Sequence, residues 1–396
     1  MLFLKCNSQY FHICVLSNQS YMINRVLENL LNEKLFKGKA IIILGPRQVG
    51  KSTLLKMIES KQEKKILNLN CDNNDIRKLL TEPGINDLRR LIGDYELVLI
   101  DEAQRVLNIG LTLKLITDQI PGLQLIVTGS SSLELSNQVN EPLTGRKFEY
   151  QLFPLSIKEL VDHFGFIEVQ RNLKHYMIFG TYPDVINHPG NEAEILNNLV
   201  GSYLFKDVFM FQDIRKPEFI EQLLEALALQ VASEVSYNEL AHLLKTNSHT
   251  VQRYISLLER AFIIFRLRSY SRNVRNEIKK SRKIYFYDNG VRNAILRNFG
   301  AVASRTDSGA LWENFFIAER MKHLHYNKVY SHRYFWRTAQ QQEIDYIEEF
   351  DGRLAAFEIK LNPKAKVFFP KTFTANYPGS TTHIVNPDSF WEHIGV

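Results

Sequence analysis

The sequence feature that most constrains the fold is a glycine-rich loop that joins an apolar strand to a helix. The run Ala40–Leu44 is aliphatic and rich in β-branched residues, which is typical of a buried strand. It leads into Gly45-Pro-Arg-Gln-Val-Gly-Lys-Ser52, and an apolar-periodic helix begins near Thr53. This spacing of glycines, lysine and hydroxyl is typical of a phosphate-binding loop. We therefore expect the chain to bind a nucleoside triphosphate; a tight turn without a ligand is the alternative.

The loop supplies a set of expected nucleotide contacts. Its glycines let backbone N–H groups turn toward phosphate oxygens, a lysine reaches the β- and γ-phosphates, and a hydroxyl binds Mg²⁺. Lys51 and Ser52 stand at the last two positions. We expect the nucleotide to contact Gly45, Pro46, Arg47, Gln48, Val49, Gly50, Lys51, Ser52 and Thr53, with Ser52 also a metal ligand.

Two later strands bring polar residues toward the same place. The run Glu96–Ile100 predicts a strand that delivers Asp101 and Glu102, and Leu123–Thr128 predicts another. We expect Asp101 to bind Mg²⁺ and Glu102 to polarise the attacking water. Thr128 is expected to contact the γ-phosphate or to order that water. A solvated acidic pair at the end of a strand is the alternative.

Strands that alternate with helices between residues 22 and 150 predict an α/β core. Such a core has a parallel sheet, helices on both faces and its ligand at the carboxyl ends of the strands. Arg146, in the polar loop 137–147, is a candidate for the arginine that completes a neighbouring subunit's site and stabilises the transferring phosphoryl group. An ordinary surface arginine is equally compatible. Residues 151–230 are expected to form a helical lid.

Residues 231–283 predict a winged helix-turn-helix. Tyr237–Leu244 and His249–Arg260 have the spacing of two short helices, Ser248 is the expected N-cap of the second, and a strand follows. Between residues 245 and 290, eleven Lys or Arg stand against three acids, while the whole chain carries only +6. This excess indicates a polyanion partner or a solvated face. We expect DNA contacts from Thr250, Gln252, Arg253, Arg272, Lys279, Lys280 and Arg282; a module used only for packing is the alternative.

The last segment, residues 284–396, predicts a second α/β unit with a cluster of charges. A helix carries Glu313, and the strands Glu343–Glu348 and Leu354–Leu361 carry Asp345, Glu358 and Lys360. Residues i and i+2 of a strand share a face, so Glu358 and Lys360 point the same way. We expect Asp345 and Glu358 to bind Mg²⁺, Lys360 to activate water, and Glu313 to bind a second ion or the water, as in phosphodiester cleavage. A buried ion-paired cluster is the alternative.

Composition sets the remaining limits. We find no apolar run of about eighteen residues, so no membrane span is expected. Three cysteines show neither a disulfide framework nor a zinc pattern, which is typical of a reducing compartment. Residues 1–21 have no clear period and are interpreted as an extension.

From residue 22 to about Pro387 the chain resembles a group of prokaryotic AAA+-type P-loop ATPases. Their last domain, of unknown function, is similar to PD-(D/E)xK nucleases. The resemblance rests on GPRQVGKS at 45–52, LIDEAQ at 99–104, TGSS at 128–131, Gly145-Arg146, Trp336-Arg337, Glu343-Ile-Asp345-Tyr and Glu358-Ile-Lys360. The usual Gly-Gly-Tyr-Pro turn stands here as Gly180-Thr-Tyr-Pro183. The resemblance implies ATP rather than GTP, Mg²⁺, a bacterial or archaeal cytoplasm, and a homo-oligomer in which Arg146 acts between subunits.

The favoured function is an ATPase acting on DNA by remodelling, translocation or processing of branched DNA, with a nuclease-like domain that cuts or grips. Two alternatives stay open. One is a DNA-binding regulator gated by nucleotide, and the other is a protein-remodelling ATPase without nuclease activity.

Overall fold

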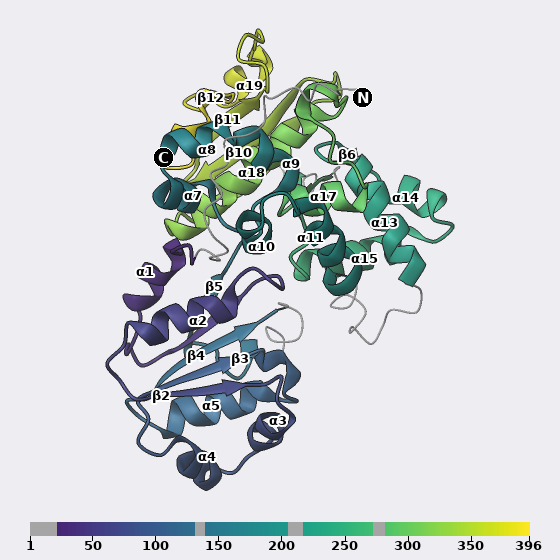
Figure 1. Cartoon of the computed structure of the whole chain (residues 1–396). Coiled ribbons are helices and arrows are strands. Elements are labelled where there is room, and N and C mark those ends of the chain that lie inside the picture. Colours follow the sequence, from purple (N-terminus) through teal and green to yellow (C-terminus); the bar gives the residue numbers. More distant parts are fainter. Residues whose placement is uncertain (1–21, 131–138, 205–216, 272–281) are drawn as a thin grey trace, which may run out of the picture.

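The structure, a computed structural model, describes residues 22–130, 139–204, 217–271 and 282–396 (Figure 1). Two sheets organise it. The first belongs to the N-terminal core, at the bottom of Figure 1, and the second runs through the C-terminal half.

The core sheet has five parallel strands in the order β2-β3-β4-β1-β5. The predicted parallel sheet is therefore confirmed. The strands are β1 (Ala40–Leu44), β2 (Ile66–Asn70), β3 (Leu97–Asp101), β4 (Gln124–Gly129) and β5 (Lys147–Gln151). The fifth strand was not expected from the sequence, because Lys147–Gln151 (KFEYQ) has no continuous apolar run. In the structure it is only partly buried.

Helices cover both faces of this sheet, as predicted. Alternate residues of a strand point to opposite faces, so Ile41 and Ile43 enter one hydrophobic cluster while Ile42 and Leu44 enter another. The first cluster takes α1 (Val26–Asn32) and α2 (Lys51–Ser60). The second takes α3 (Asn74–Leu80), α4 (Ile85–Ile92), the 3₁₀ turn η1 (Ala103–Arg105) and α5 (Ile109–Gln119).

The expected helical segment follows the core. It contains α7 (Ile157–Phe164), α8 (Phe166–Arg171), α9 (Leu173–Phe179), α10 (Pro183–Asn187), α11 (Glu192–Asn198), a π-helical stretch η2 (Leu199–Leu204) and α13 (Pro217–Leu229). A capping box between Ser156 and Glu159 fixes the start of α7.

The expected pair of short helices is present as α14 (Tyr237–Leu243) and α15 (Ser248–Arg260). The N-cap of α15 is Asn247 and not Ser248, because the Asn247 side chain accepts the Thr250 N–H at 2.8 Å. Short strand β6 (Glu234–Val235) precedes the pair, and β7 (Ile264–Ser269) and β8 (Arg282–Phe286) follow it as an antiparallel hairpin.

The second sheet has seven strands in the order β12-β11-β10-β9-β7-β8-β6. Its remaining strands are β9 (His332–Arg337), β10 (Glu343–Phe350), β11 (Arg353–Ile359) and β12 (Thr381–Val385). Helices α17 (Asn289–Ile295), α18 (Ser308–Tyr326), α19 (Lys371–Asn376), α20 (Phe390–His393) and the 3₁₀ turn η3 (Val302–Ser304) complete the segment. The expected boundary at residues 283 and 284 falls inside β8, so the helix-turn-helix and the C-terminal segment share one sheet.

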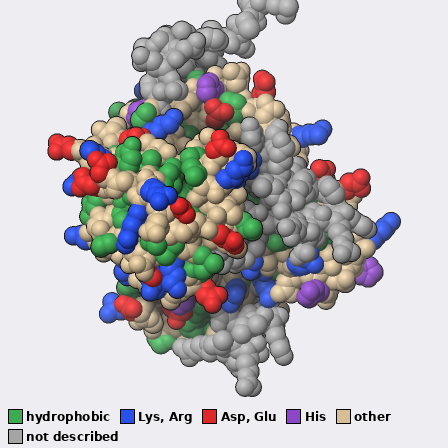
Figure 2. Space-filling view, turned by 90° about the horizontal axis from the view of Figure 1, so that it is seen from below, with side chains coloured by type: hydrophobic (Ala, Val, Ile, Leu, Met, Phe, Trp, Pro, Cys, Tyr) green, Lys and Arg blue, Asp and Glu red, His purple; other side chains and the backbone are tan. Residues whose placement is uncertain are grey.

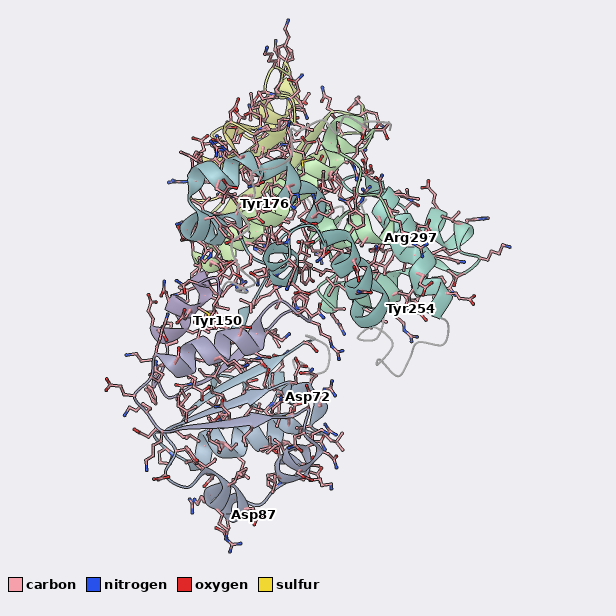
Figure 3. All side chains as sticks on the ribbon, viewed as in Figure 1. Asp72, Asp87, Tyr150, Tyr176, Tyr254 and Arg297 are labelled. Carbon is pink, nitrogen blue, oxygen red and sulfur yellow. The ribbon has the colours of Figure 1, made fainter. Side chains whose placement is uncertain are left out.

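The core and the C-terminal half meet along β5. Tyr150, labelled in Figure 3, lines a pocket there together with His325 of α18 and Tyr330. The Gln151 N–H donates to His325 Nε2 at 3.1 Å. Within the described residues, no helix has the length and apolar character needed to cross a bilayer.

Candidate functional site

The predicted phosphate loop connects β1 to α2. Gly50, the residue before α2, has φ +97°, which favours glycine, and an added Cβ would lie 3.4 Å from Arg25 Nη1. Lys51 is buried, and its Nζ donates to the carbonyls of Gly45 at 3.0 Å and Pro46 at 2.9 Å. The ammonium group therefore lies against the loop itself, where phosphate oxygens would also find it.

The hydroxyl and the acid expected to bind Mg²⁺ are in contact. Ser52 Oγ donates to Asp101 Oδ2 at 2.6 Å, and the Thr128 hydroxyl donates to Asp101 Oδ1. Strand order brings these residues together, because β4 lies between β1 and β3 and Thr128 of β4 pairs with Ile43 of β1. The carboxyl ends of all three strands then meet at one edge of the sheet.

Glu102 stands beside this group in a constrained backbone conformation. Its φ is +55°, uncommon for a residue with a side chain. Its N–H donates to the Thr128 hydroxyl at 3.2 Å, and its carboxylate accepts the Gln104 amide at 2.5 Å. Gln104 also donates to Ser130 Oγ at 2.8 Å. Gln104, to which sequence reasoning gave no role, thus orients the expected general base.

Glu102 and the loop share a pocket of about 320 Å³. One wall consists of Gln48, Gly50, Lys51, Ser52, Thr53 and Glu102. A second wall comes from α10 and the residue after it, namely Pro183, Asp184, Asn187 and His188. Sequence reasoning missed this second wall; the only signal was the Gly180–Pro183 turn, to which no nucleotide role was given.

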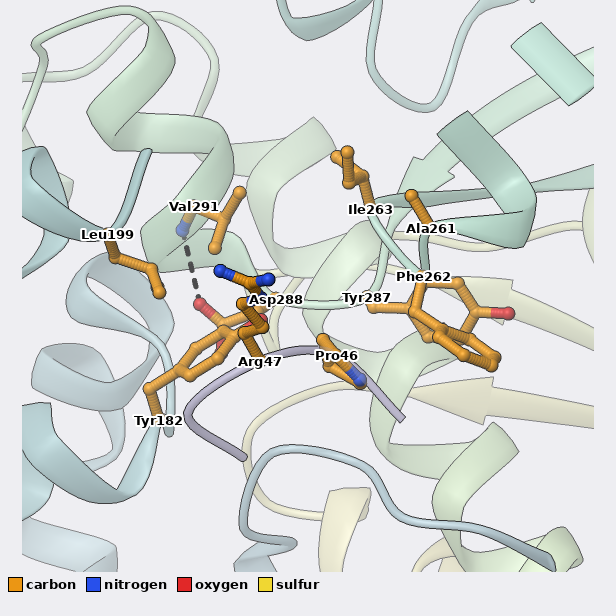
Figure 4. Close-up of a pocket in the computed structure, with 10 residues that line it drawn as sticks. All are labelled: Pro46, Arg47, Tyr182, Leu199, Ala261, Phe262, Ile263, Tyr287, Asp288 and Val291. Carbon is orange, nitrogen blue, oxygen red and sulfur yellow. Dashed lines mark hydrogen bonds between the residues drawn. The ribbon is translucent and has the colours of Figure 1, made fainter. Parts of the chain in front are cut away.

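Two residues near the start of the loop line a different pocket. Pro46 and Arg47 line it together with Tyr182, Tyr287 and Asp288 of the helical and C-terminal segments (Figure 4). Val49 is buried, and its carbonyl accepts Arg25 Nη1 at 2.8 Å. The expected nucleotide residues therefore divide: Gln48, Gly50 and Lys51–Thr53 line the pocket with Glu102, while Pro46 and Arg47 contact the rest of the chain.

The residues at the pocket fit a magnesium ion. Hydroxyl and carboxylate oxygens are the hard ligands that Mg²⁺ takes beside phosphate oxygens, and Ser52 Oγ and Asp101 Oδ2 lie 2.6 Å apart. Bound there, the ion would neutralise charge that develops between the β- and γ-phosphates.

Arg146 lies away from this pocket. It directly precedes β5 and its carbonyl accepts the N–H of Ala40, the first residue of β1, so it sits at the amino ends of the parallel strands. Its Nε donates to Asp118 Oδ1 at 2.6 Å. Arg146 cannot complete the site of its own chain from this edge.

The expected DNA contacts are only partly described. Gln252 and Arg253 are exposed on α15, Thr250 is half-buried, and the opposite face packs through Val251, Tyr254, Ile255 and Leu258 as predicted. The Arg282 guanidinium lies 5.0 Å from the centre of the Tyr237 ring. Arg272, Lys279 and Lys280 lie outside the described residues.

Two cations of the same basic segment are not available to DNA. Arg266 pairs with Glu259 through Nε at 2.7 Å. Lys283 is buried, and its Nζ lies 2.6 Å from Glu343 Oε1 and 3.2 Å from Glu313 Oε1. Sequence reasoning counted both among solvent-facing charges, because a local run of cations carries no information about acids far away in the chain.

The four residues of the predicted C-terminal site come together. Lys360 Nζ lies 3.1 Å from Asp345 Oδ2 and 2.9 Å from Glu358 Oε2. Burial and the neighbouring Asp345 raise the pKa of Glu358 to about 7.

Glu313 joins this cluster through a different cation. Besides Lys283, it accepts the Tyr285 hydroxyl at 2.7 Å. Burial, with a further contribution from Asp345, raises the pKa of Glu313 to about 7. Burial lowers the pKa of Lys283, but Glu313 and Glu343 outweigh it, so the net direction is upward.

The structure shows this cluster as a set of ion pairs. Among the residues that the structure describes, no group of three or more His, Cys, Asp and Glu side chains could hold one. Lys283 forms an ion pair with Glu313, and Lys360 forms ion pairs with Asp345 and Glu358. The metal role of Glu313, Asp345 and Glu358 stays a prediction.

The loop, the acid pair and the parallel sheet have the arrangement of a P-loop nucleotide-binding domain. In agreement, a family model described as an AAA domain matches residues 37–161. Two others, described as domains of unknown function (DUF8612 and DUF4143), match residues 170–301 and 308–388. The PD-(D/E)xK likeness of the last domain is not among these findings.

Proteins similar in sequence over most of this chain occur in bacteria and archaea. The uncharacterized protein Rv2008c of Mycobacterium tuberculosis is 26% identical over 336 residues, which covers 83% of this chain and 72% of that protein. The uncharacterized protein MJ1544 of Methanocaldococcus jannaschii is 25% identical over 354 residues, with 84% and 76% covered. Among solved structures, the Walker-type ATPase paby2304 of Pyrococcus abyssi aligns with a TM-score of 0.48 at 16% identity, covering 69% of this chain and 96% of that one.

Proposed function

We propose that this protein binds and hydrolyses ATP with Mg²⁺ and uses the cycle to act on DNA. The observation that carries the ATPase part is the contact of Ser52 with Asp101 at 2.6 Å, since Ser52 also lines one pocket with Lys51 and Glu102. These four side chains supply the phosphate, metal and water contacts that phosphoryl transfer to water requires.

Each residue has a separate role in this reaction. Lys51 leaves the loop carbonyls to contact the β- and γ-phosphates. Ser52 and Asp101 hold the ion, and Thr128 fixes the Asp101 carboxylate through its hydroxyl. Glu102 takes a proton from water as it attacks the γ-phosphorus, and the Gln104 amide holds that carboxylate in place.

DNA is the proposed partner because of α15. An exposed polar and cationic edge, Gln252 and Arg253, lies on a helix whose other face is packed, and a β-hairpin follows. This order of a short strand, two helices and a hairpin is that of a winged helix-turn-helix. By contrast, the face seen in Figure 2 mixes Lys and Arg with Asp and Glu and with hydrophobic side chains, and so offers no single-sign surface to a polyanion.

We further propose that the C-terminal cluster grips or supports rather than cuts. Its carboxylates are already paired with Lys283 and Lys360.

We also propose that the chain assembles with copies of itself. Arg146 lies at the amino ends of the strands, whereas the nucleotide pocket lies at their carboxyl ends. If Arg146 contacts a γ-phosphate, that phosphate is therefore bound to a neighbouring subunit.

The proposal is tested by ATP hydrolysis with duplex, single-stranded, branched and no DNA, beside a plasmid-nicking assay. Stimulation by one form of DNA supports it. Tight DNA binding with unaffected turnover would instead indicate a regulator gated by nucleotide. Absence of DNA affinity at low salt, where phosphate contacts are strongest, would leave a protein-remodelling ATPase.

A further inference from the structure

The wall of the nucleotide pocket that comes from the helical segment carries polar groups that the hydrolysis steps above do not use. It is formed by α10 and His188, directly after the Gly180–Pro183 turn. Three of its side chains can hydrogen-bond: Asp184, Asn187 and His188. The wall belongs to the helical segment, whereas the loop belongs to the core.

Asp184 and His188 form a pair one helical turn apart. His188 Nδ1 lies 2.9 Å from Asp184 Oδ1 and also 2.9 Å from the Asp184 carbonyl oxygen. Both contacts engage the same ring nitrogen. Within the described residues Nε2 makes no hydrogen bond, and the side chain is 52% exposed, so this nitrogen is accessible to a ligand.

A second observation concerns Asn187, which also lines the pocket. Asn187 Oδ1 is buried, and in the described part of the chain no donor reaches it. A buried carbonyl oxygen without a donor costs on the order of 1–3 kcal/mol. A hydroxyl or water brought in with a ligand would supply that donor.

The position of the wall decides which part of the ligand it meets. In the proposed reaction Lys51 contacts the β- and γ-phosphates, Ser52 holds the ion bound to them, and Glu102 directs water to the γ-phosphate. The wall lines the same pocket as these residues, and a Cβ added to Gly50 of the loop would lie 3.9 Å from Pro183 Cγ of the wall. A polar group on the wall is therefore within reach of phosphates that the loop holds, and the terminal phosphate is the one that ATP has and ADP lacks.

We propose that His188 is a nucleotide-sensing residue that donates from Nε2 to a γ-phosphate oxygen, with Asp184 as its positioning residue. This inference rests on ATP binding at the proposed site. An imidazolium donates from both nitrogens, to the Asp184 carboxylate and to the phosphate at once. The contact ties α10 to the core only while ATP is bound, and cleavage of the γ-phosphate releases it.

The experiment compares affinities for ATP and ADP, each with Mg²⁺, in full-length protein carrying Glu102→Gln so that ATP persists during the titration. Hydrogen bonds to charged groups contribute about 1.5–3 kcal/mol. His188→Ala should therefore weaken ATP about ten-fold or more and leave ADP within about two-fold. Asp184→Asn should lower the ATP-to-ADP affinity ratio by a smaller factor, and His188→Arg, which keeps a cationic donor, should restore part of it.

The matched control is His175→Ala. His175 pairs with Glu192 at 3.2 Å in the same helical segment and does not line the pocket. An unchanged ATP-to-ADP ratio in His188→Ala, or an equal loss in His175→Ala, overturns the inference. If the parent protein binds neither nucleotide, the proposed function fails instead, so the two failures are distinguishable.

Discussion

Arg25 Nη1 donates to the carbonyl oxygen of Val49 at 2.8 Å, so a side chain from the residue before α1 holds the phosphate loop from behind. The same guanidinium donates to the Phe153 carbonyl at 2.6 Å and to Glu159 Oε1 at 3.1 Å. Arg25 and Glu159 are both buried. This ion pair therefore links the loop to the start of the helical segment.

Replacing Arg25 by Met should destabilise the protein and weaken ATP binding. Removal of one partner of a buried ion pair costs roughly 3–5 kcal/mol, because the other charge stays buried without compensation. Thermal unfolding measures the first effect and ATP titration the second. The double variant Arg25→Met with Glu159→Gln should regain stability without regaining affinity. Full ATP affinity in that double variant would contradict the supporting role of Arg25.

Lys51→Ala and Glu102→Gln should separate binding from hydrolysis. Lys51→Ala removes the phosphate cation and should abolish measurable ATP binding. Glu102→Gln keeps the pocket but loses the proton acceptor, so ATP should bind near-normally while kcat falls by about 10² or more. Nucleotide titration and steady-state turnover provide the two measurements, and normal turnover in either variant would refute the assignment.

The parts of this site that the sequence predicts are those within a continuous run of residues. The loop, the strand before Asp101 and the apolar face of α15 each leave a local pattern. Arg25, by contrast, is 134 residues from Glu159, and nothing near it in the chain indicates that pairing. His188 likewise has no local pattern that indicates a nucleotide role, because it lines the pocket only through the way the helical segment folds against the core.

The Gly180–Pro183 turn shows how a sequence departure can be understood only in three dimensions. Gly180 has φ +69°, and an added Cβ would lie 2.0 Å from Asp288 Oδ1, so only glycine fits. Thr181 stands where the resemblance leads one to expect Gly. Its hydroxyl accepts Lys322 Nζ at 3.2 Å, and its N–H donates to Asp288 at 2.8 Å. Thr181 therefore links the turn before α10 to α18.

Lys283→Met should destabilise the C-terminal sheet. It leaves Glu313, whose side chain is 12% exposed, without its cation, at a cost toward the lower end of about 3–5 kcal/mol, while the half-buried Glu343 keeps Arg337 at 3.6 Å. Adding Glu313→Gln should recover part of the loss. Thermal unfolding compares these variants with Lys364→Met, an exposed lysine of the same segment. If both lysine variants unfold at the same temperature as the parent, Lys283 does not hold the cluster together.

The contact between β5 and α18 should weaken in acid. Burial, with a further contribution from Arg333, lowers the pKa of His325 from 6.5 to about 4. Between these values the unfolded chain takes up a proton that the folded chain does not, so stability is lost as the pH falls from about 6.5 to 4. The loss amounts to at most about 3 kcal/mol, at about 1.4 kcal/mol per pH unit.

His325→Gln isolates that effect. The glutamine carbonyl can still accept the Gln151 N–H but does not titrate, so the drop in melting temperature between pH 7 and pH 5 should be smaller than in the parent. His242→Gln on the exposed edge of α14 is the control and should behave like the parent. An identical pH dependence in the His325 variant would rule out His325 as the group responsible.

Gln252→Ala with Arg253→Ala should weaken DNA binding and change its dependence on salt. Each cation withdrawn from a DNA phosphate lowers the slope of log affinity against log salt by about one, so removal of Arg253 should flatten that slope by about one. Arg90→Ala, on α4 of the core, removes an exposed arginine far along the chain and should leave the slope unchanged. Because Gln252 carries no charge, restoring it alone should recover affinity without recovering slope. A double variant with the parent's slope would mean that α15 faces solvent and not a phosphate backbone.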